Sequence, residues 1–335
     1  MFDFELDRTI QELKRRNVSR LLVQIPYGLR SRAFYIADSI TKETSAEVII
    51  SADPCYGACD LATNEATQIE ADMILHLGHA QIPEITTPKI FFVEARATID
   101  ISPVISEAEK RLQDEHEIGL MSTVQHVHNL NQAKQILESL GKNVVVPRAS
   151  GKVAYDGQIL GCDFGTAKTI AHKVEAFIVI GGGDFHGLGV QIATGTRTLV
   201  CDPFANEVRD MSDLARRFLR KRYAMIEAFK KAHRIGVLIV TKTGQLNLDQ
   251  ARSLRDLLEK KGHQCLLISA EEVRPAILES FSDIEAFVNT GCPRIARDDQ
   301  EMFKKPVLTP DEALVAVGIT QWKDYVNEDP TKNKT

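Results

Sequence analysis

The sequence predicts an α/β protein of three similar domains, each a mainly parallel sheet flanked by helices. Short apolar runs alternate with amphipathic helical segments along the chain, a pattern typical of parallel strands covered by helices on both faces. One stretch of sequence also returns about 117 residues later. With 335 residues, the chain is long enough for two or three domains that each have a hydrophobic core.

The repeated stretch begins once at Glu117 and again at Arg234. Each copy opens with an apolar run around Ile-Gly and reaches an Asn-Leu-Asx-Gln-Ala segment. Each then continues as an amphipathic helix and enters a second run rich in β-branched residues or leucine. A repeat of this length is the size of a domain, whereas solenoid repeats are much shorter.

The remaining expected elements follow the same plan. The first third has expected strands at 21–25, 46–52, 71–78 and 89–95, with a helix over 30–44. The middle third has expected strands at 119–124, 144–146, 175–183 and 197–203. The last third has expected strands at 236–241, 265–269, 285–292 and 306–310. We therefore predict domains over 1–113, 114–232 and 233–335. A basic helix over 215–234 is either a connector with a solvated positive face or a docking surface for an acidic partner.

Composition and charge exclude several classes of protein. A net charge of −5 and a pI near 6.0 argue against a direct nucleic-acid binder. The charged N-terminal segment lacks the apolar core of a signal peptide, and no run of about 18 apolar residues predicts a membrane span. We therefore expect a cytoplasmic protein. Thiols stay reduced there, so spaced cysteines more often bind metal or take part in catalysis than form disulfides.

Three of the six cysteines follow expected strand ends. Cys59 and Cys162 follow the second strand of the first and middle thirds, and Cys292 follows the third strand of the last. Ligands of α/β sheets bind beyond the carboxyl ends of strands, and thiolates are the ligands of iron–sulfur clusters. Three domains around a pseudo-threefold axis would therefore bring the thiolates to a central cluster site. Three cysteines on a four-iron cluster leave one iron open to substrate.

A buried core role is the alternative for any free cysteine. Cys201 and Cys265 lie in apolar strands, and we assign both to the core. Glycine and polar neighbours instead flank the three cysteines at strand ends. Cys55 lies four residues before Cys59, but no C-x-x-C pair or His-rich stretch completes a zinc site of the usual spacing.

Two histidine pairs also raise the question of a metal site. They are His76 with His79 and His126 with His128. Histidine pairs that lack a third ligand are usually local hydrogen-bonding groups, and we interpret both pairs in that way.

Six motifs in this order resemble the archaeal diphthamide synthase family, the 2-(3-amino-3-carboxypropyl)histidine synthases. The resemblance extends from about residue 20 to residue 315. The motifs are IPYGL (25–29), DPCYGACDLA (53–62), ILGCDFGTA (159–167), GGGDFHGLG (181–189), DPF (202–204) and NTGCPRIARDD (289–299).

The resemblance implies three homologous α/β domains, a homodimer and a [4Fe–4S] cluster held by one cysteine from each domain. Carried over motif by motif, the ligands are Cys59 in YGACD, Cys162 in LGCD and Cys292 in TGCPR. Cys55 matches no ligand of the family, which makes it a neighbour of Cys59 in this interpretation.

The resemblance also implies a reaction, the first step of diphthamide biosynthesis. S-adenosylmethionine is reductively cleaved at its Cγ–S bond, with an electron from a donor that the sequence does not identify. Its 3-amino-3-carboxypropyl group is transferred to the imidazole C2 of a histidine in translation elongation factor 2. The chain lacks the CxxxCxxC motif of ordinary radical S-adenosylmethionine enzymes, so this radical transferase would be noncanonical. The chemistry is centred on the cluster, and we assign no catalytic side chain.

The candidate contacts to S-adenosylmethionine are Gly28, Gly182, Asp184, His186 and Arg294. Glycines let the backbone approach a ligand, and successive N–H groups form an anion nest. A guanidinium suits the substrate carboxylate. The alternatives are a structural turn, a histidine that caps a carbonyl, and a salt bridge from Arg294 to an acidic residue such as Asp298. No nucleotide-type helix is expected after 181–189, which disfavours a dinucleotide site.

Two other functions compete with this one. A quinolinate synthase-like enzyme would also use three domains and three cysteines, with the [4Fe–4S] cluster acting as a Lewis acid on small metabolites. A non-catalytic α/β ligand-binding module would need no cluster. The YGACDL and TGCPRIARDD stretches favour the diphthamide family over the first alternative, and cysteines at strand ends argue against the second.

Overall fold

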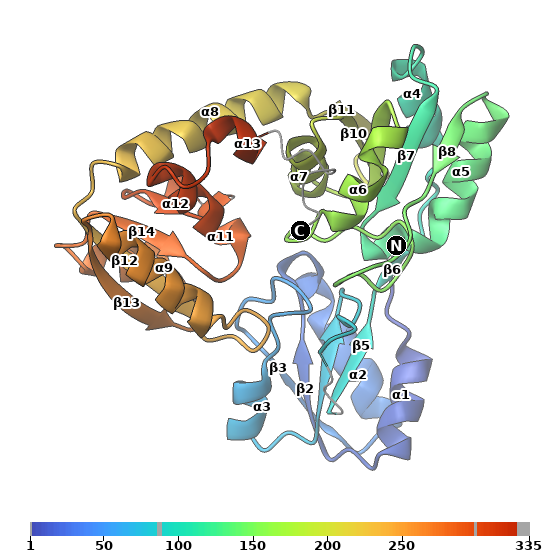
Figure 1. Cartoon of the computed structure of the whole chain (residues 1–335). Helices are drawn as coiled ribbons and strands as arrows, with labels where there is room; N and C mark the ends of the chain where they lie inside the picture. The colour runs from blue at the N-terminus through green and yellow to red at the C-terminus, as the bar shows by residue number, and fades with distance from the viewer. Residues whose placement is uncertain (1, 86–88, 298–299, 327–335) are drawn as a thin grey trace. The chain divides into compact units, whose positions relative to one another are not determined.

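The computed structural model describes residues 2–85, 89–297 and 300–326. Three sheets, formed by residues 20–93, 117–210 and 234–308, make up its framework (Figure 1). Their strand orders are β3-β2-β4-β5, β8-β7-β9-β10-β11 and β13-β12-β14-β15. In each sheet the first strand along the chain therefore lies between the second and the third. This arrangement confirms the predicted α/β fold class, with sheets of mainly parallel strands flanked by helices.

The first sheet is parallel between all its neighbouring strands. Its strands are β2 (Arg20–Gln24), β3 (Glu47–Ile50), β4 (Met73–Leu77) and β5 (Ile90–Val93). Its helices are α1 (Leu6–Arg15), the 3-10 helix η1 (Tyr27–Arg32), α2 (Ala33–Glu43) and α3 (Thr63–Gln68). A small antiparallel pair joins β1 (Phe2–Asp3) to β6 (Arg96–Ala97). Leu21 and Val23 belong to one core cluster and Leu22 to another, so β2 is buried on both faces.

In the second sheet β7 pairs in parallel with β8 and with β9. Its strands are β7 (Glu117–Ser122), β8 (Asn143–Val145), β9 (Ala176–Ile180), β10 (Arg197–Asp202) and β11 (Glu207–Asp210). Its helices are α4 (Ser102–Arg111), η2 (Val124–Asn129), α5 (Leu130–Ser139), α6 (Gly165–Ile170), η3 (Ala171–Lys173) and α7 (Phe185–Thr194).

The third sheet is again parallel between all its neighbours. Its strands are β12 (Arg234–Val240), β13 (Gln264–Ala270), β14 (Ala286–Asn289) and β15 (Val307–Leu308). Its helices are α8 (Ser212–Phe229), α9 (Leu248–Lys260), α10 (Pro275–Ser280), α11 (Pro293–Arg297), η4 (Gln300–Met302), α12 (Pro310–Ala316) and α13 (Trp322–Val326). The apolar face of α9 packs on β12 and β13 (Figure 1).

By internal contacts the chain divides into two compact units. The first contains residues 1–160, 173–183 and 199–209. The second contains residues 161–172, 184–198 and 210–335. The boundaries near 113 and 232 lie between the three sheets, and the three-domain division remains a prediction.

Two details differ from the sequence expectation. Helix α7 begins directly after the glycine-rich segment 181–184, where we expected no nucleotide-type helix. Gly187 and Gly189 weaken the helical pattern there, which explains the error. Helix α8 confirms a basic helix near 215–234, but its Arg222 is completely buried, so its positive charge is not wholly solvated.

Within the described residues, no helix combines the length and the apolar character needed to cross a membrane.

Candidate functional site

Each of the three predicted ligand cysteines lies in a loop beyond the carboxyl end of a strand. Cys59 lies between β3 and α3, Cys162 between β8 and α6, and Cys292 between β14 and α11. Cys59 is partly buried, Cys162 is exposed and Cys292 is buried. Cys59 belongs to the first unit and the other two to the second. A common site for all three therefore remains a prediction.

The loop that carries Cys59 is held by buried polar groups of the first unit. Gln24 Nε2 donates to the carbonyl of Asp60 over 2.7 Å, and the Asp60 carboxylate accepts the N–H of Tyr56 over 3.1 Å. Arg30 donates to the carbonyls of Ala52 and Asp53 over 3.0 and 2.6 Å. The backbone on both sides of Cys59 is therefore fixed to β2 and to η1.

The loop that carries Cys162 packs against helix α7. A Cβ added to Gly161 would lie 1.8 Å from Cε1 of Phe185, so the ring occupies the space that a side chain would need. Asp163 Oδ1 accepts the N–H of Gly165 over 2.8 Å, which turns the chain into α6. This contact leaves the cysteine side chain itself at the surface.

The loop that carries Cys292 is fixed by a buried amide. Asn289 is fully buried, and its Nδ2 donates to the carbonyl of Cys292 over 2.8 Å while its Oδ1 accepts the N–H of Gly291 over 3.2 Å. The N–H of Cys292 donates to Gln245 Oε1 over 3.2 Å. A Cβ on Gly291 would lie 2.3 Å from Cγ2 of Val240, so glycine is required for this close approach.

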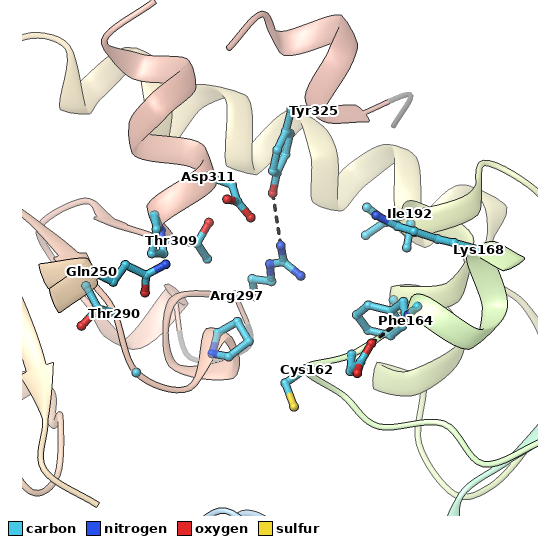
Figure 2. Close-up of a pocket in the computed structure, with 17 residues that line it drawn as sticks. Cys162, Phe164, Lys168, Ile192, Gln250, Thr290, Arg297, Thr309, Asp311 and Tyr325 are labelled. Carbon is cyan, nitrogen blue, oxygen red and sulfur yellow. Dashed lines mark hydrogen bonds between the residues drawn. The ribbon is translucent and has the colours of Figure 1, made fainter. Parts of the chain in front are cut away.

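A cavity of about 460 Å³ in the second unit lies beside two of these loops (Figure 2). Cys162 lines it, and so do Gly291 and Pro293 on either side of Cys292. The wall also contains two aromatic and four charged side chains: Phe164, Tyr325, Asp163, Lys168, Arg297 and Asp311. A mixed lining of this kind suits a small zwitterionic ligand.

The cationic side of the cavity is supported by a buried network. Arg297 Nη2 lies 3.4 Å from the hydroxyl of Tyr325 (Figure 2). That hydroxyl donates to Glu312 Oε1 over 3.0 Å. Glu312 is paired with Arg222, whose Nε donates over 2.8 Å. Burial alone would raise the pKa of Glu312, but hydrogen bonds and charge from Arg222 outweigh it and hold that pKa below its usual value. Arg297 Nε is buried and has no hydrogen-bond partner among the described residues.

The candidate contacts to S-adenosylmethionine are divided between the two units. In the second unit, the Arg294 guanidinium lies 4.3 Å over the ring of Phe185. That ring is 5.2 Å from the ring of His186, and Asp184 directly precedes α7. Among the described residues that line the 460 Å³ cavity, none is one of the five candidates. Asp298, the alternative partner of Arg294, lies outside the described residues.

The two glycine candidates lie in the first unit. A Cβ on Gly182 would lie 3.9 Å from a carboxylate oxygen of Asp202. Gly28 lines a different hollow, together with Phe2 and Tyr35.

Cys201 and Cys265 lie in strands, as the sequence predicted. Cys201 is buried in β10, where burial raises its pKa to about 12. Cys265 is partly buried in β13, and burial raises its pKa to about 11. Both thiols are therefore protonated at neutral pH, and neither is a ready metal ligand.

Sequence reasoning missed two groupings. It did not place Arg297 and Tyr325 in a cavity. It also left Cys55, His76 and His79 without a shared role, although their ligand atoms converge in the first unit. Burial and the neighbouring His79 hold the pKa of His76 well below its usual value, so its imidazole is neutral. Cys55 follows β3, and His76 and His79 lie at the end of β4. Because β3 and β4 both pair with β2, the sheet order is the signal that could have grouped these three residues.

The fold and the three cysteine loops define a class of α/β protein. Each of its three mainly parallel sheets has one cysteine in a loop beyond the carboxyl end of a strand. Residues 25–326 match the family model of diphthamide synthesis proteins, and the chain belongs to that family. The chain is 35% identical over 317 residues to the 2-(3-amino-3-carboxypropyl)histidine synthase of Pyrococcus horikoshii, with 94% of this chain and 91% of the relative covered.

A eukaryotic relative and a solved structure agree with this membership. Subunit 1 of the Schizosaccharomyces pombe 2-(3-amino-3-carboxypropyl)histidine synthase is 31% identical over 333 residues, which cover 96% of this chain and 75% of the relative. The crystal structure of Dph2 from Pyrococcus horikoshii with a 4Fe-4S cluster matches with a TM-score of 0.87 and 34% identity. That match covers 96% of this chain and 93% of the Dph2 chain.

Proposed function

We propose that this protein transfers the 3-amino-3-carboxypropyl group of S-adenosylmethionine to the imidazole C2 of a histidine in translation elongation factor 2. The observation that carries the proposal is the match over residues 25–326, which includes the three cysteine loops. Relatives across that span are named as synthases of the modified histidine. Membership in this family also disfavours a quinolinate synthase and a non-catalytic module.

Cys59, Cys162 and Cys292 are the proposed ligands of a [4Fe–4S] cluster. Their thiols fit the role, because each stands in a polar, glycine-containing loop at a strand end, whereas Cys201 and Cys265 lie within strands. The matching Dph2 structure is described with such a cluster. When bound, the cluster supplies the electron that reductively cleaves the Cγ–S bond of S-adenosylmethionine.

The chain itself would bind and orient the co-substrate. The cavity of about 460 Å³ falls within the range of about 300–1,000 Å³ that small-molecule sites occupy. Arg297 offers a guanidinium for the substrate carboxylate, and Asp311 offers a carboxylate for the ammonium or sulfonium. The hydrogen bonds from Arg297 to Tyr325 and from Tyr325 to Glu312 orient the guanidinium before the ligand binds. Arg294 beside Phe185 is the second candidate for the carboxylate, with Asp184, His186, Gly28 and Gly182 as further proposed contacts.

Product analysis tests the bond that breaks. The reconstituted protein is reduced anaerobically with dithionite and given S-adenosylmethionine, and the nucleosides are separated chromatographically. Cleavage at Cγ leaves 5′-methylthioadenosine, which we expect above the protein-free control. Release of 5′-deoxyadenosine as the main product would mean that the chemistry is that of ordinary radical enzymes and that the proposal is wrong.

The proposed substrate is a protein, and the proposed active form is a cytoplasmic homodimer. Label from S-adenosylmethionine should enter purified elongation factor 2, and free histidine should remain unlabelled. Equal labelling of both would contradict the protein substrate. Light scattering at micromolar concentration should give the mass of two chains, and a monomer alone would remove the dimer from the proposal.

The cysteine assignment is tested by iron content. Alanine in place of Cys59, Cys162 or Cys292 should sharply reduce bound iron and sulfide after anaerobic reconstitution, whereas Cys201→Ala and Cys265→Ala should retain them. Full iron content and activity in Cys162→Ala would overturn the assignment.

The carboxylate contact is tested with two ligands that differ in that group. Arg297→Gln should weaken binding of S-adenosylmethionine at least tenfold and leave binding of methylthioadenosine, which has no carboxylate, unchanged. Arg294→Gln tests the competing candidate and should cause a smaller selective loss. A larger selective loss in Arg294→Gln would assign the contact to Arg294 instead.

A further inference from the structure

A second group of soft ligand atoms lies in the first unit, apart from the three proposed cluster ligands. Cys55 follows β3, His76 lies in β4, and His79 follows β4. The sulfur of Cys55 lies 3.9 Å from His76 Nε2 and 3.9 Å from His79 Nδ1, and these two nitrogens are 2.9 Å apart. Cys55 and His76 are buried and His79 is partly buried. One thiol and two imidazoles therefore converge on one point.

The buried Gln24 fixes the orientation of the His76 lone pair. Gln24 Nε2 donates to the carbonyl of Asp60 over 2.7 Å, so its Oε1 is the acceptor, and the N–H of Ala62 donates to Oε1 over 3.3 Å. His76 Nδ1 lies 2.8 Å from this same oxygen and must donate to it. His76 Nε2 then carries a lone pair that faces Cys55 and His79. Metal-ligating histidines are held in this way, with the other ring N–H given to an oxygen acceptor.

The distances fit a tetrahedral zinc ion. Zn–N bonds of about 2.05 Å and Zn–S bonds of about 2.3 Å at tetrahedral angles place two nitrogens about 3.3 Å apart and a nitrogen about 3.6 Å from sulfur. The observed separations of 2.9 and 3.9 Å each differ from these values by only a few tenths of an ångström. One thiolate with two imidazoles is also a donor set that zinc accepts.

We propose that Cys55, His76 and His79 form a Zn²⁺ site, with a fourth position left for water or another donor. The proposal rests on the geometry of these residues alone and not on the proposed transferase activity. The ion would replace the hydrogen bond between the two imidazoles and join the loop after β3 to β4. It would thereby fix the segment 52–62, which carries Cys59, to a buried strand.

The test uses the full chain in which Cys59, Cys162 and Cys292 are all alanine, so that zinc cannot bind at those thiols. After treatment with a chelator, the protein is titrated with Co²⁺ as a spectroscopic substitute and then with Zn²⁺. We expect one equivalent of metal, a sulfur-to-cobalt charge-transfer band and the d–d bands of tetrahedral cobalt, all abolished by zinc. Absence of these bands together with no zinc binding would overturn the proposal.

Variants then assign the ligands. In the same background, Cys55→Ser should remove the charge-transfer band, and both Cys55→Ser and His79→Ala should weaken zinc binding at least a hundredfold. Gln24→Leu, which removes the acceptor of His76 Nδ1 and also the bonds to the Asp60 carbonyl and the Ala62 N–H, should weaken it about 10–100-fold. Cys265→Ser and the exposed His172→Ala are the matched controls and should bind as before. Circular dichroism checks that each variant is folded. Unchanged binding in folded Cys55→Ser or His79→Ala protein would overturn the proposed site.

Discussion

The most deeply buried polar side chains of the two compact units differ in charge. In the first unit, the polar side chains with 1% or less exposure are neutral and include the imidazoles of His76 and His126 and the amide of Gln24, whereas its buried charged groups are slightly more exposed. The second unit buries a charged pair, Arg222 with Glu312, and both side chains are fully inaccessible to solvent. A neutral imidazole is stable inside the protein only while it stays unprotonated, whereas a buried pair is stable only while both partners are present. The two units should therefore respond to different perturbations.

The largest expected effect follows loss of one member of the buried pair. Arg222→Met leaves Glu312 buried without its cation and should lower the free energy of unfolding by about 3–5 kcal/mol. Urea denaturation measures this change. Lys221→Met is the control, because its pair with Glu301 is exposed and should contribute less than about 1 kcal/mol. Equal effects of the two variants would contradict a special role for burial.

Mild acid should instead weaken the first unit. Burial, followed by repulsion from His128, lowers the pKa of His126 from 6.5 to about 4. Between these two pKa values, His126 is protonated in the unfolded chain and neutral in the folded chain. The free energy of unfolding is therefore highest near pH 7 and falls as pH drops from about 6.5 toward 4. His126 alone should account for about 2 kcal/mol between pH 7 and pH 5.

Urea denaturation across pH, combined with hydrogen exchange to resolve the units, measures this loss. His126→Phe should reduce the pH dependence of the first unit by the share of His126 and leave that of His76, and His172→Phe, at an exposed position, should leave it unchanged. The second unit should behave differently, because the pKa of Glu312 is lowered. Its contribution is present above the ordinary carboxyl pKa and is lost only as pH falls through the still lower folded value. Equal losses of unfolding free energy in both units at pH 5 would contradict the expected difference between the units.

The smallest expected difference between paired variants concerns two cysteine loops within the second unit. Gly291→Ala places a Cβ 2.3 Å from Val240, a buried β-branched residue of β12 that has no room to move. The cost should be about 2–3 kcal/mol. Gly161→Ala meets the outer ring atoms of Phe185, a partly buried side chain that can shift more readily than Val240, and should cost about 1 kcal/mol. Thermal unfolding measures both, and a larger cost at Gly161 would reverse our assignment of the rigid loop.

Most of the strand framework was predictable because buried parallel strands are continuous apolar runs bounded by polar segments. Strands β2 and β12 are buried on both faces and appear clearly in the sequence. Helix α7 was not predictable, because its glycines remove the helical pattern. The burial of Arg222 was not predictable either. Its partner Glu312 lies 90 residues later, and the sequence of a basic helix does not indicate which of its cations will pair with so distant a residue.

Some residues of the candidate site were likewise predictable from local sequence, and others were not. Glycine and polar neighbours marked Cys59, Cys162 and Cys292, which local sequence alone distinguishes from Cys201 in its apolar strand. The grouping of Cys55 with His76 depends on strand adjacency in the sheet order β3-β2-β4, which no local pattern encodes. Arg297 was missed for a similar reason, because its supports come from two later helices, with Glu312 in α12 and Tyr325 in α13.

The strands of each sheet come from one contiguous stretch of chain, and this has a consequence for biosynthesis. Each sheet has all its strands as soon as its own segment leaves the ribosome, so the sheets can form in order from the N-terminus. The proposed cluster ligands, in contrast, come from distant parts of the chain, because 233 residues separate Cys59 from Cys292. At about 5–20 residues per second, Cys59 emerges roughly 10–50 s before the last ligand. Iron could therefore not be enclosed by all three thiols during synthesis of the first two sheets, and the proposed cluster would be loaded only after translation of the third.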